Sequence, residues 1–452
     1  MKTIRIGSGA GTALDLVEPA VELLEKGNLD YLCFECLAER TLAWANLEKL
    51  EDPAKGYNSI LEFRMGKILD SYKKIGSKTK IISNMGAANP HAAMLKIAEI
   101  AKEKGLKGLK VAAVIGDDVL AKVNDFLDLT VMETGVKLAE HKDSIVSANA
   151  YIGAAGIIEA LKNGADIVVA GRVADPTLFL APAIHEFGWK MDDWDKLASG
   201  TIAGHLLECS SMITGGYFAD PEYGKISENL WKIGFPIGIL YENGNLEITK
   251  VEGSGGVVNT MTVKEQLTYE INNPAEYLTP DCILSFLDVE VVQLGKDHVS
   301  IKGARGKPKT GKLKLNVGYR DCFIGEGEIT YGGPTCVNRA KIAAEFVKKR
   351  LELTGVKYSE IRCDLIGLSS IFDEKLGVEW SAGKNAEVRL RVAARTKDRE
   401  NALRIGREVE ALPMAGPAGG GAHRGVVREI LSIASVLIDE NMVKQTVEYQ
   451  EV

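Results

Sequence analysis

Short polar turns that follow apolar runs carry the residues best suited to chemistry in this sequence. Arg172 and Asp175 follow the apolar run 166–170 within AGRVADP, and Asn84 and Asn89 stand in SNMGAANP. An arginine fork binds a carboxylate through two parallel hydrogen bonds, and side-chain amides bind carbonyl or hydroxyl groups. We therefore expect Arg172 to clamp a carboxylate, and Asn84, Asn89 and Asp175 to contact the same ligand.

A purely structural interpretation also exists for these residues. Arg172 and Asp175 could form a salt bridge that only braces the loop. Asn89 precedes Pro90, and proline is common as the first residue of a helix, so Asn89 could be an ordinary helix cap. The sequence leaves both interpretations open.

A proton-transfer group is expected at Glu39, with Glu35 as the neighbouring candidate. Both residues follow the apolar run 29–34, and burial at a sheet edge would raise the pKa of either carboxyl and make it a stronger base. Elimination and retro-aldol reactions need such a base, together with donors for a developing enolate oxygen. The structural alternative is a helix start at which Glu39 and Arg40 are solvated or salt-bridged.

The first glycine-rich segment is a candidate for anion binding. Gly7, Ser8, Gly9 and Gly11 stand between a predicted strand and a predicted helix, so their amides could hold an anion or form a tight structural turn. The spacing lacks the GxGxxG pattern of dinucleotide sites and the lysine of phosphate-binding loops. These two differences disfavour an NAD-dependent oxidoreductase.

A second glycine-rich segment, AGPAGGGAHRG, covers residues 415–425. Its glycines and prolines are incompatible with the interior of a helix, so we expect a bending backbone there. His423 and Arg424 in this loop are candidates to contact a bound anion.

Metal and covalent chemistry find little support in the residues. Asp117 and Asp118 are adjacent, and adjacent carboxylates usually point apart, so we expect no metal site. Cys33 and Cys36 lie inside an apolar run and are expected to be packed thiols; seven unevenly spaced cysteines do not indicate a disulfide framework. HExxH and GxSxG motifs are absent from the sequence.

The elements that must position these residues alternate between strands and helices. Five apolar runs read as strands: residues 3–6, 29–34, 80–82, 110–115 and 166–170. Helical stretches of ten or more residues separate several of them, a pattern typical of parallel pairing with right-handed crossovers. Ligands of such sheets bind at the carboxyl ends of the strands. We therefore expect the polar turns to converge on one edge.

The pattern changes in the second half of the chain, where short β-like runs such as 246–251 and 312–319 alternate with helices at 337–353 and 397–412. We expect an α/β fold with a parallel-sheet N-terminal domain, residues 1–230, and a smaller α+β C-terminal domain, residues 231–452. The strand-end ligand site belongs to the first domain and the loop 415–425 to the second.

The composition is that of an average globular protein, with 452 residues, 46% hydrophobic residues and a formal net charge of -7. An acidic balance disfavours nucleic acid and anionic membranes as partners. The first residues show no signal peptide and no apolar run reaches 18 residues, so we expect a cytoplasmic protein.

Several blocks of the sequence together resemble the acyclic terpene utilisation family, the AtuA-like proteins. The blocks are LDYLCFECLAERT, SNMGAANP, AGRVADPTLFLAP, GHLLECSSMITGG, VEGSGGVVNT and GPAGGGAHRG. The resemblance implies a link to the degradation of citronellol-type terpenes through acyl-CoA intermediates, with a lyase step on a branched hydroxyglutaryl-CoA. It also implies a small companion domain, which we expect here as a separate polypeptide.

Together these observations predict a lyase or hydro-lyase that acts on a small hydroxy or unsaturated carboxylate, free or as its CoA thioester. Glu39, Arg172 and Asn84 would be its catalytic residues, and we expect a homo-oligomer without a metal. The alternative is a non-catalytic subunit, either metabolite-binding or a scaffold, of a two-component enzyme. The same polar turns would then bind a metabolite without transferring a proton.

Overall fold

A mixed ten-stranded sheet organises most of the chain in the computed structural model, which describes residues 1–381 and 384–452. Its central five strands run parallel to one another, in the spatial order β1 (Thr3–Ala10), β2 (Tyr31–Phe34), β3 (Lys80–Ser83), β6 (Ile167–Ala170) and β4 (Lys110–Ile115). The five strands expected from the apolar runs are therefore present and parallel. Their carboxyl ends lie on one edge of the sheet.

Antiparallel strands extend this parallel core on both sides. They are β7 (Pro236–Tyr241), β8 (Leu246–Lys250), β12 (His298–Lys302) and β11 (Glu290–Gly295) beyond β1, and β18 (Thr446–Glu451) beyond β4. The sheet is thus mixed rather than parallel. Strands from far along the chain complete it because β7 pairs with β1 and β18 pairs with β4.

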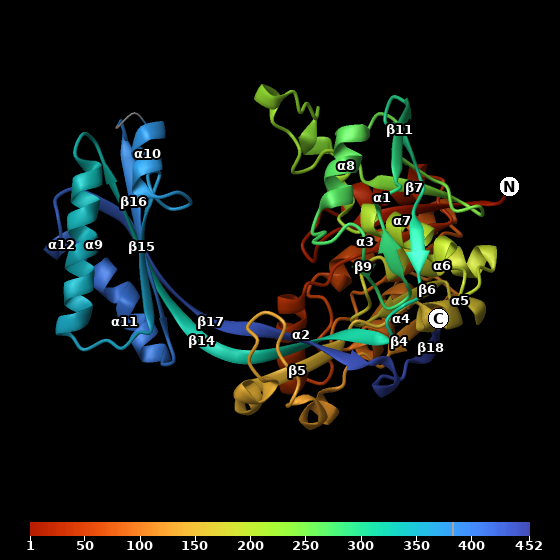
Figure 1. Ribbon diagram of the computed structural model, residues 1–452, viewed down its shortest axis with the longest axis horizontal. Coiled ribbons are helices and arrows are strands. Elements are labelled where there is room, and N and C mark those ends of the chain that lie inside the picture. The colour runs from red at the N-terminus through yellow and green to blue at the C-terminus, as the bar shows by residue number, and fades with distance from the viewer. Residues whose placement is uncertain (382–383) are drawn as a thin grey trace. The chain divides into compact units, whose positions relative to one another are not determined.

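Helices pack on both faces of this sheet (Figure 1). One face is covered by α1 (Glu18–Lys26), α3 (Leu61–Ile75) and α4 (Pro90–Glu103), whose apolar side chains share a core with Leu32 and Phe34 of β2. On the opposite face of β2, the Cys33 thiol donates to Leu178 O of α6 (Thr177–Phe187), 3.3 Å away. The alternation of side chains along a strand accounts for both contacts.

Further elements surround the sheet. The helices are α2 (Glu39–Glu51), α5 (Ala155–Lys162), α7 (Trp194–Leu207) and α8 (Thr260–Thr268); the strands are β5 (Ile145–Ala150), β9 (Tyr277–Leu278), β10 (Ile283–Ser285) and β13 (Arg305–Lys307). Short 3-10 turns are η1 (Leu120–Phe126), η2 (Leu138–Ser144), η3 (Ser210–Met212), η4 (Pro221–Tyr223), η5 (Leu230–Lys232) and η6 (Glu440–Met442).

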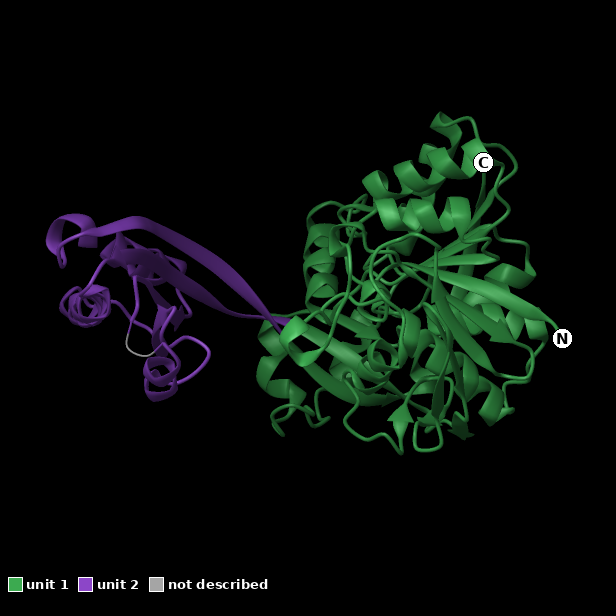
Figure 2. Ribbon diagram, turned by 90° about the horizontal axis from the view of Figure 1, so that it is seen from above, with its two compact units in different colours: residues 1–318, 433–452 green, residues 319–432 purple. Residues whose placement is uncertain are grey.

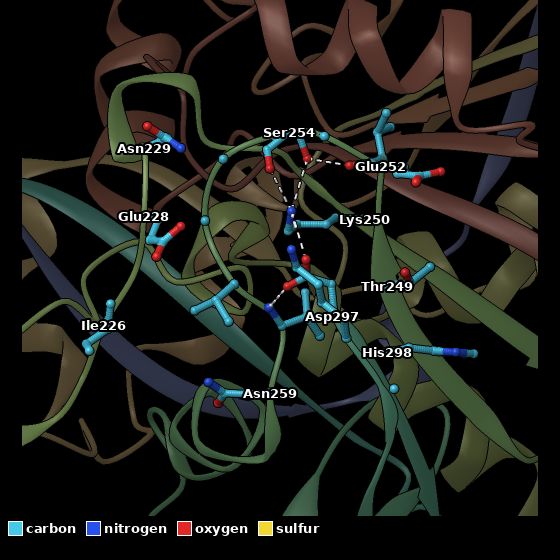
Figure 3. Close-up of a pocket in the computed structure, with 18 of the residues that line it drawn as sticks. Ile226, Glu228, Asn229, Thr249, Lys250, Glu252, Ser254, Asn259, Asp297 and His298 are labelled. Atoms are coloured by element: carbon cyan, nitrogen blue, oxygen red, sulfur yellow. Dashed lines mark hydrogen bonds and ion pairs between the residues drawn. The ribbon is translucent and has the colours of Figure 1, made fainter.

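The chain divides into two compact units, shown in different colours in Figure 2. The first unit contains residues 1–318 and 433–452, and the second contains residues 319–432. Residue 230, the expected domain boundary, lies inside the first unit. The chain passes between the units along β14 (Lys312–Gly332) and β17 (Gly420–Asp439).

The second unit has the connectivity of a ferredoxin-like domain. Its elements follow the order β14, α9 (Cys336–Leu353), β15 (Glu360–Ile366), β16 (Glu387–Thr396), α11 (Arg399–Glu410) and β17, and the sheet order is β15-β16-β14-β17. This is the split βαβ arrangement with two crossover helices. The short helices α10 (Glu374–Trp380) and α12 (Leu412–Ala415) lie in its connections. The α+β combination of strands and helices expected for the second half of the chain is thus found in this unit.

The glycine-rich segment 415–425 is only in part a loop. Helix α12 ends at Ala415 and strand β17 begins at Gly420, so only the residues between them connect the two elements. Gly419 adopts a φ of 74°, a conformation that glycine tolerates without steric cost. The expected bend is therefore confined to a tight turn before a strand.

Among the described residues, none of the helices combines the length and the apolar character that crossing a bilayer requires.

Candidate active site

Turns at the carboxyl ends of four parallel strands are linked by hydrogen bonds. After β3, Asn84 Nδ2 donates to Glu35 Oε1 after β2, at 2.9 Å. After β6, the Arg172 amide donates to Asp117 Oδ2 after β4, at 3.0 Å. The polar turns that the sequence places at one sheet edge are therefore in contact there.

Arg172 lies at the centre of these turns and is fully buried. Its Nε donates to Val173 O at 2.8 Å, its Nη1 to Leu37 O, and its Nη2 to Val173 O and to the Asp175 carboxylate. The guanidinium also stacks on the ring of Tyr151, 4.4 Å from the ring centroid. Each guanidinium nitrogen thus donates to another group of the protein. This matches the bracing role and not the expected carboxylate clamp.

A cavity of about 470 Å³ opens beside this cluster. Two of the residues named from the sequence, Glu39 and Asp175, line it, whereas Arg172 does not. The other polar groups on its wall come from five separate segments of the first unit: Tyr151, His205 with Glu208, Glu270, Tyr277, and Lys312 with Lys314. Ala174, Pro176, Leu278 and Leu437 add apolar surface.

Glu208, at the C-terminal end of α7, is the most unusual group on this wall. Its Oε1 lies 3.2 Å from Nδ1 of His205, and its Oε2 is buried without a hydrogen-bond partner. Burial, together with the negative charges of Asp175 and Glu270, raises the pKa of Glu208 well above its usual value. The protonated form of the carboxyl is therefore favoured relative to an exposed glutamate, and Oε2 has no protein partner.

His205 precedes Glu208 by one helical turn and is also buried. Its ring packs against Tyr277 and Phe286, with centroid distances of 5.6 and 5.5 Å, and those two rings also contact each other. Burial lowers the pKa of His205 to about 4. The imidazole next to Glu208 is therefore neutral at neutral pH.

Glu39 has the opposite character to Glu208. Burial alone would raise its pKa, but a hydrogen bond from the Tyr151 hydroxyl at 2.7 Å and the charge of Lys314 at 3.3 Å lower the pKa of Glu39 to about 2. The carboxylate is therefore a weak base. The expected pKa elevation is found instead at Glu35, where burial and the charge of Asp175 raise the pKa to about 8.

Two opposing effects act on the pKa of Asp175. Burial raises the pKa of Asp175, and the positive charge of Arg172 acts in the opposite direction. The side chain keeps 34% of its surface exposed, so one carboxylate oxygen is held by Arg172 while the group still faces the cavity.

The two asparagines named from the sequence form hydrogen bonds to other groups of the protein. Asn84 is buried; besides its bond to Glu35, its Oδ1 accepts from the Cys36 amide at 2.7 Å. Asn89 caps α4 by accepting from the Ala92 amide, and its Nδ2 donates to Pro53 O and Lys55 O at 2.8 and 2.7 Å. Neither side chain lines the cavity.

The first glycine-rich segment forms a strand rather than an anion-binding loop. Gly7, Ser8 and Gly9 belong to β1, which runs to Ala10. A side chain at Gly9 would collide with the Phe34 ring, and one at Gly11 with the backbone of Cys209. These glycines are needed because neighbouring segments pack directly against them.

His423 and Arg424 belong to β17 in the second unit, whereas all residues of the cavity belong to the first unit. Arg424 Nε donates to Glu328 Oε2 at 2.7 Å, so its partner is a carboxylate of its own sheet.

Lys312, Lys314 and Glu208 of the cavity wall were not expected from the sequence. Lys312 and Lys314 alternate along one face of β14, and His205 and Glu208 have the i, i+3 spacing of one helix face. Both spacings are visible in the sequence. Their place on the cavity wall is not visible, because no local pattern indicates that these side chains lie near Asp175.

The described residues contain no group of three or more His, Cys, Asp or Glu side chains arranged to hold an ion. All seven cysteines are free thiols, and Cys33 and Cys36 are buried. The cavity is therefore built from carboxyls, tyrosines, a histidine and lysines.

Comparison with known proteins adds the family. The family model for the acyclic terpene utilisation family protein AtuA matches residues 4–449. The chain belongs to the AtuA family. The AtuA match includes both compact units and all residues of the cavity. No curated protein and no solved structure matches the chain.

Proposed function

We propose that this AtuA family protein is a lyase or hydro-lyase that acts in the 470 Å³ cavity on a small hydroxy or unsaturated carboxylate, free or as its CoA thioester. The observation that carries the proposal is a pair of carboxyls on one wall, both with raised pKa values, of which only Asp175 contacts a cation. Glu208 offers a proton from a partnerless oxygen, and Asp175 is held by Arg172. Pairs of acids whose environments separate their pKa values serve as acid and base.

In the elimination direction, Asp175 takes the proton next to the carboxylate or thioester carbonyl. The electron pair forms the carbon–carbon double bond, the carbon–oxygen bond breaks, and Glu208 gives its proton to the leaving hydroxyl, which departs as water. Addition of water reverses these steps. General acid–base groups of this kind contribute about 10²–10⁴ to a rate.

The lysines would bind the acidic part of the substrate. Lys312 and Lys314 stand on the same strand and line the cavity, with about half of each side chain exposed. A lysine binds a carboxylate or phosphate as a point charge. Glu39 holds Lys314 and the Tyr151 hydroxyl in place, so it is a positioning residue in this scheme.

Replacement of Glu208 by Gln tests the proposal, because glutamine keeps the shape of the side chain and removes the acidic proton. With a panel of hydroxy acids, enoic acids and their CoA thioesters, we expect E208Q to lower kcat by about a hundredfold or more with little change in KM. In the parent, kcat should fall as the pH rises through the elevated pKa of Glu208.

Lys312→Gln should instead raise KM with a smaller effect on kcat, since it removes binding charge. Glu265→Gln, an exposed glutamate on α8, is the matched control and should behave as the parent. Full activity of E208Q would refute the acid assignment. Tight binding without turnover of any panel member would support a non-catalytic binding subunit.

A further inference from the structure

The sheet of residues 319–432 buries one face and leaves the other open among the described residues. Val388, Leu390 and Val392 of β16 pack into a core with α9 and α11. Cross-strand pairing places Glu328 of β14 opposite Arg391 of β16, on the other face. An antiparallel sheet with one covered face exposes polar residues on the other, and here many of them are arginines and carboxylates.

This open face consists of arginines that lie above carboxylates. We call it the arginine face. Its six arginines are Arg362, Arg389, Arg391, Arg395, Arg424 and Arg428. Its four carboxylates are Asp321, Glu326, Glu328 and Asp364.

The two kinds of side chain lie at different depths. The four carboxylates keep only 7–15% of their side-chain surface exposed, whereas the arginines keep 25–64%. Glu328 accepts from Arg424 at 2.7 Å and from Arg389 at 3.4 Å, and Glu326 accepts from Arg391 and from Arg428 at 3.2 Å. Guanidinium groups therefore form the outer layer, in excess over the acids beneath them.

The charge of the whole chain has the same asymmetry. Residues 319–432 contain 19 Lys and Arg against 16 Asp and Glu, a formal charge of +3. The chain as a whole carries -7, so the other unit carries -10. Opposite potentials on two surfaces promote association and fix its register.

We propose that the arginine face binds an acidic surface of the first unit in a second copy of the chain, in a two-fold dimer that contains this contact twice. Four strands of about seven residues, about 3.3 Å per residue and 4.8 Å apart, give a face of roughly 450 Å². Two reciprocal contacts bury roughly 1,800 Å², which lies within the range of stable interfaces. A single contact would fall below it.

Nucleic acid fits this face less well than a protein surface. The positions of β14 and β16 that share this face, such as Thr330, Arg389 and Ala393, hold no aromatic side chain on which a base could stack. The dimer does not depend on the proposed lyase activity.

The test uses the purified full chain with Arg424 and Arg428 both replaced by Gln. This double variant removes two outer charges, while Glu328 keeps Arg389 and Glu326 keeps Arg391. By sedimentation velocity at about 50 mM salt, we expect the parent to be a dimer that dissociates near 1 M, where the Debye length is about 3 Å. The variant should raise the dimer dissociation constant on the order of tenfold or more.

Lys341→Gln with Arg407→Gln is the matched control, since it removes the same charge from α9 and α11 on the covered side. This control should remain dimeric, and thermal unfolding should show that both double variants are folded. A monomeric parent at every salt concentration, or equal association of both double variants, would overturn the proposal. Binding of single-stranded RNA that only R424Q/R428Q loses would reassign the face to nucleic acid.

Discussion

At the scale of single residues, the same side chain takes different roles according to its surroundings. Glu39 lies against a tyrosine hydroxyl and a lysine, so its pKa falls to about 2. Glu208 is buried near other carboxylates, so its pKa rises. Glu35 accepts from the Leu37 amide and from Asn84, but burial and the charge of Asp175 raise its pKa to about 8. Residue type alone therefore identified candidates, and desolvation and neighbouring charges assigned their states.

The bracing role of Arg172 predicts a contribution to the free energy of unfolding. Arg172→Met keeps the volume but leaves Asp175 without its cation, and removal of one partner of a buried ion pair costs about 3–5 kcal/mol. We expect this loss in the free energy of unfolding, measured by urea denaturation. Arg305→Met, at an exposed arginine, should cost less than about 1 kcal/mol. Equal stability of both variants would contradict the bracing role.

At the scale of elements, strand ends and helix starts position the site. The parallel strands end at one edge, and the turns that follow them bond to one another through Asn84, Asp117 and Arg172. Helix α4 begins at Pro90 because Asn89 caps it. Helix α7 carries His205 and Glu208 to the cavity on one of its faces. The elements thus deliver polar groups from distant segments to a small volume.

Asn89 distinguishes a structural cap from a ligand contact. Asn89→Ala removes the cap and two donors to Pro53 O and Lys55 O, so we expect the free energy of unfolding to fall by about 2 kcal/mol. Asn89→Asp keeps the cap acceptor and should lose less. Neither variant should change KM for a substrate turned over by the parent. A rise in KM at unchanged stability would restore the ligand role expected from the sequence.

At the scale of the whole molecule, two units have separate cores. Leu32, Ile81 and Val169 share one apolar cluster in the first unit, and Leu390 and Val392 share another in the second. The cavity residues all belong to the first unit. The second unit contributes an open, arginine-covered sheet face instead.

Separate cores should make the units unfold separately. Leu390 is fully buried, and Leu390→Ala should cost about 3 kcal/mol. In hydrogen exchange, we expect amides of residues 319–432 that exchange by unfolding of this unit to speed up by about a hundredfold, while β2 and β3 keep their rates. Faster exchange in both units to the same extent would show a single cooperative molecule.

The sequence by itself determined the local elements and the family. Apolar runs marked β1, β2, β3, β4 and β6, and the pairing they predicted is parallel. Pro90 after Asn89 marked a helix start, and the motif blocks marked the AtuA family. These features depend on neighbours along the chain, so periodicity, capping chemistry and motif spacing reveal them.

Only the tertiary structure decided which residues form the cavity. Lys312 and Lys314 reach it from a strand far along the chain, and Glu208 meets Asp175 through folding alone. The antiparallel edges of the sheet and the burial of Arg172 likewise arise from pairings between distant segments. Desolvation and charge–charge interactions act through space, and for that reason the sequence pointed to Glu39, Arg172 and Asp175 but not to Glu208.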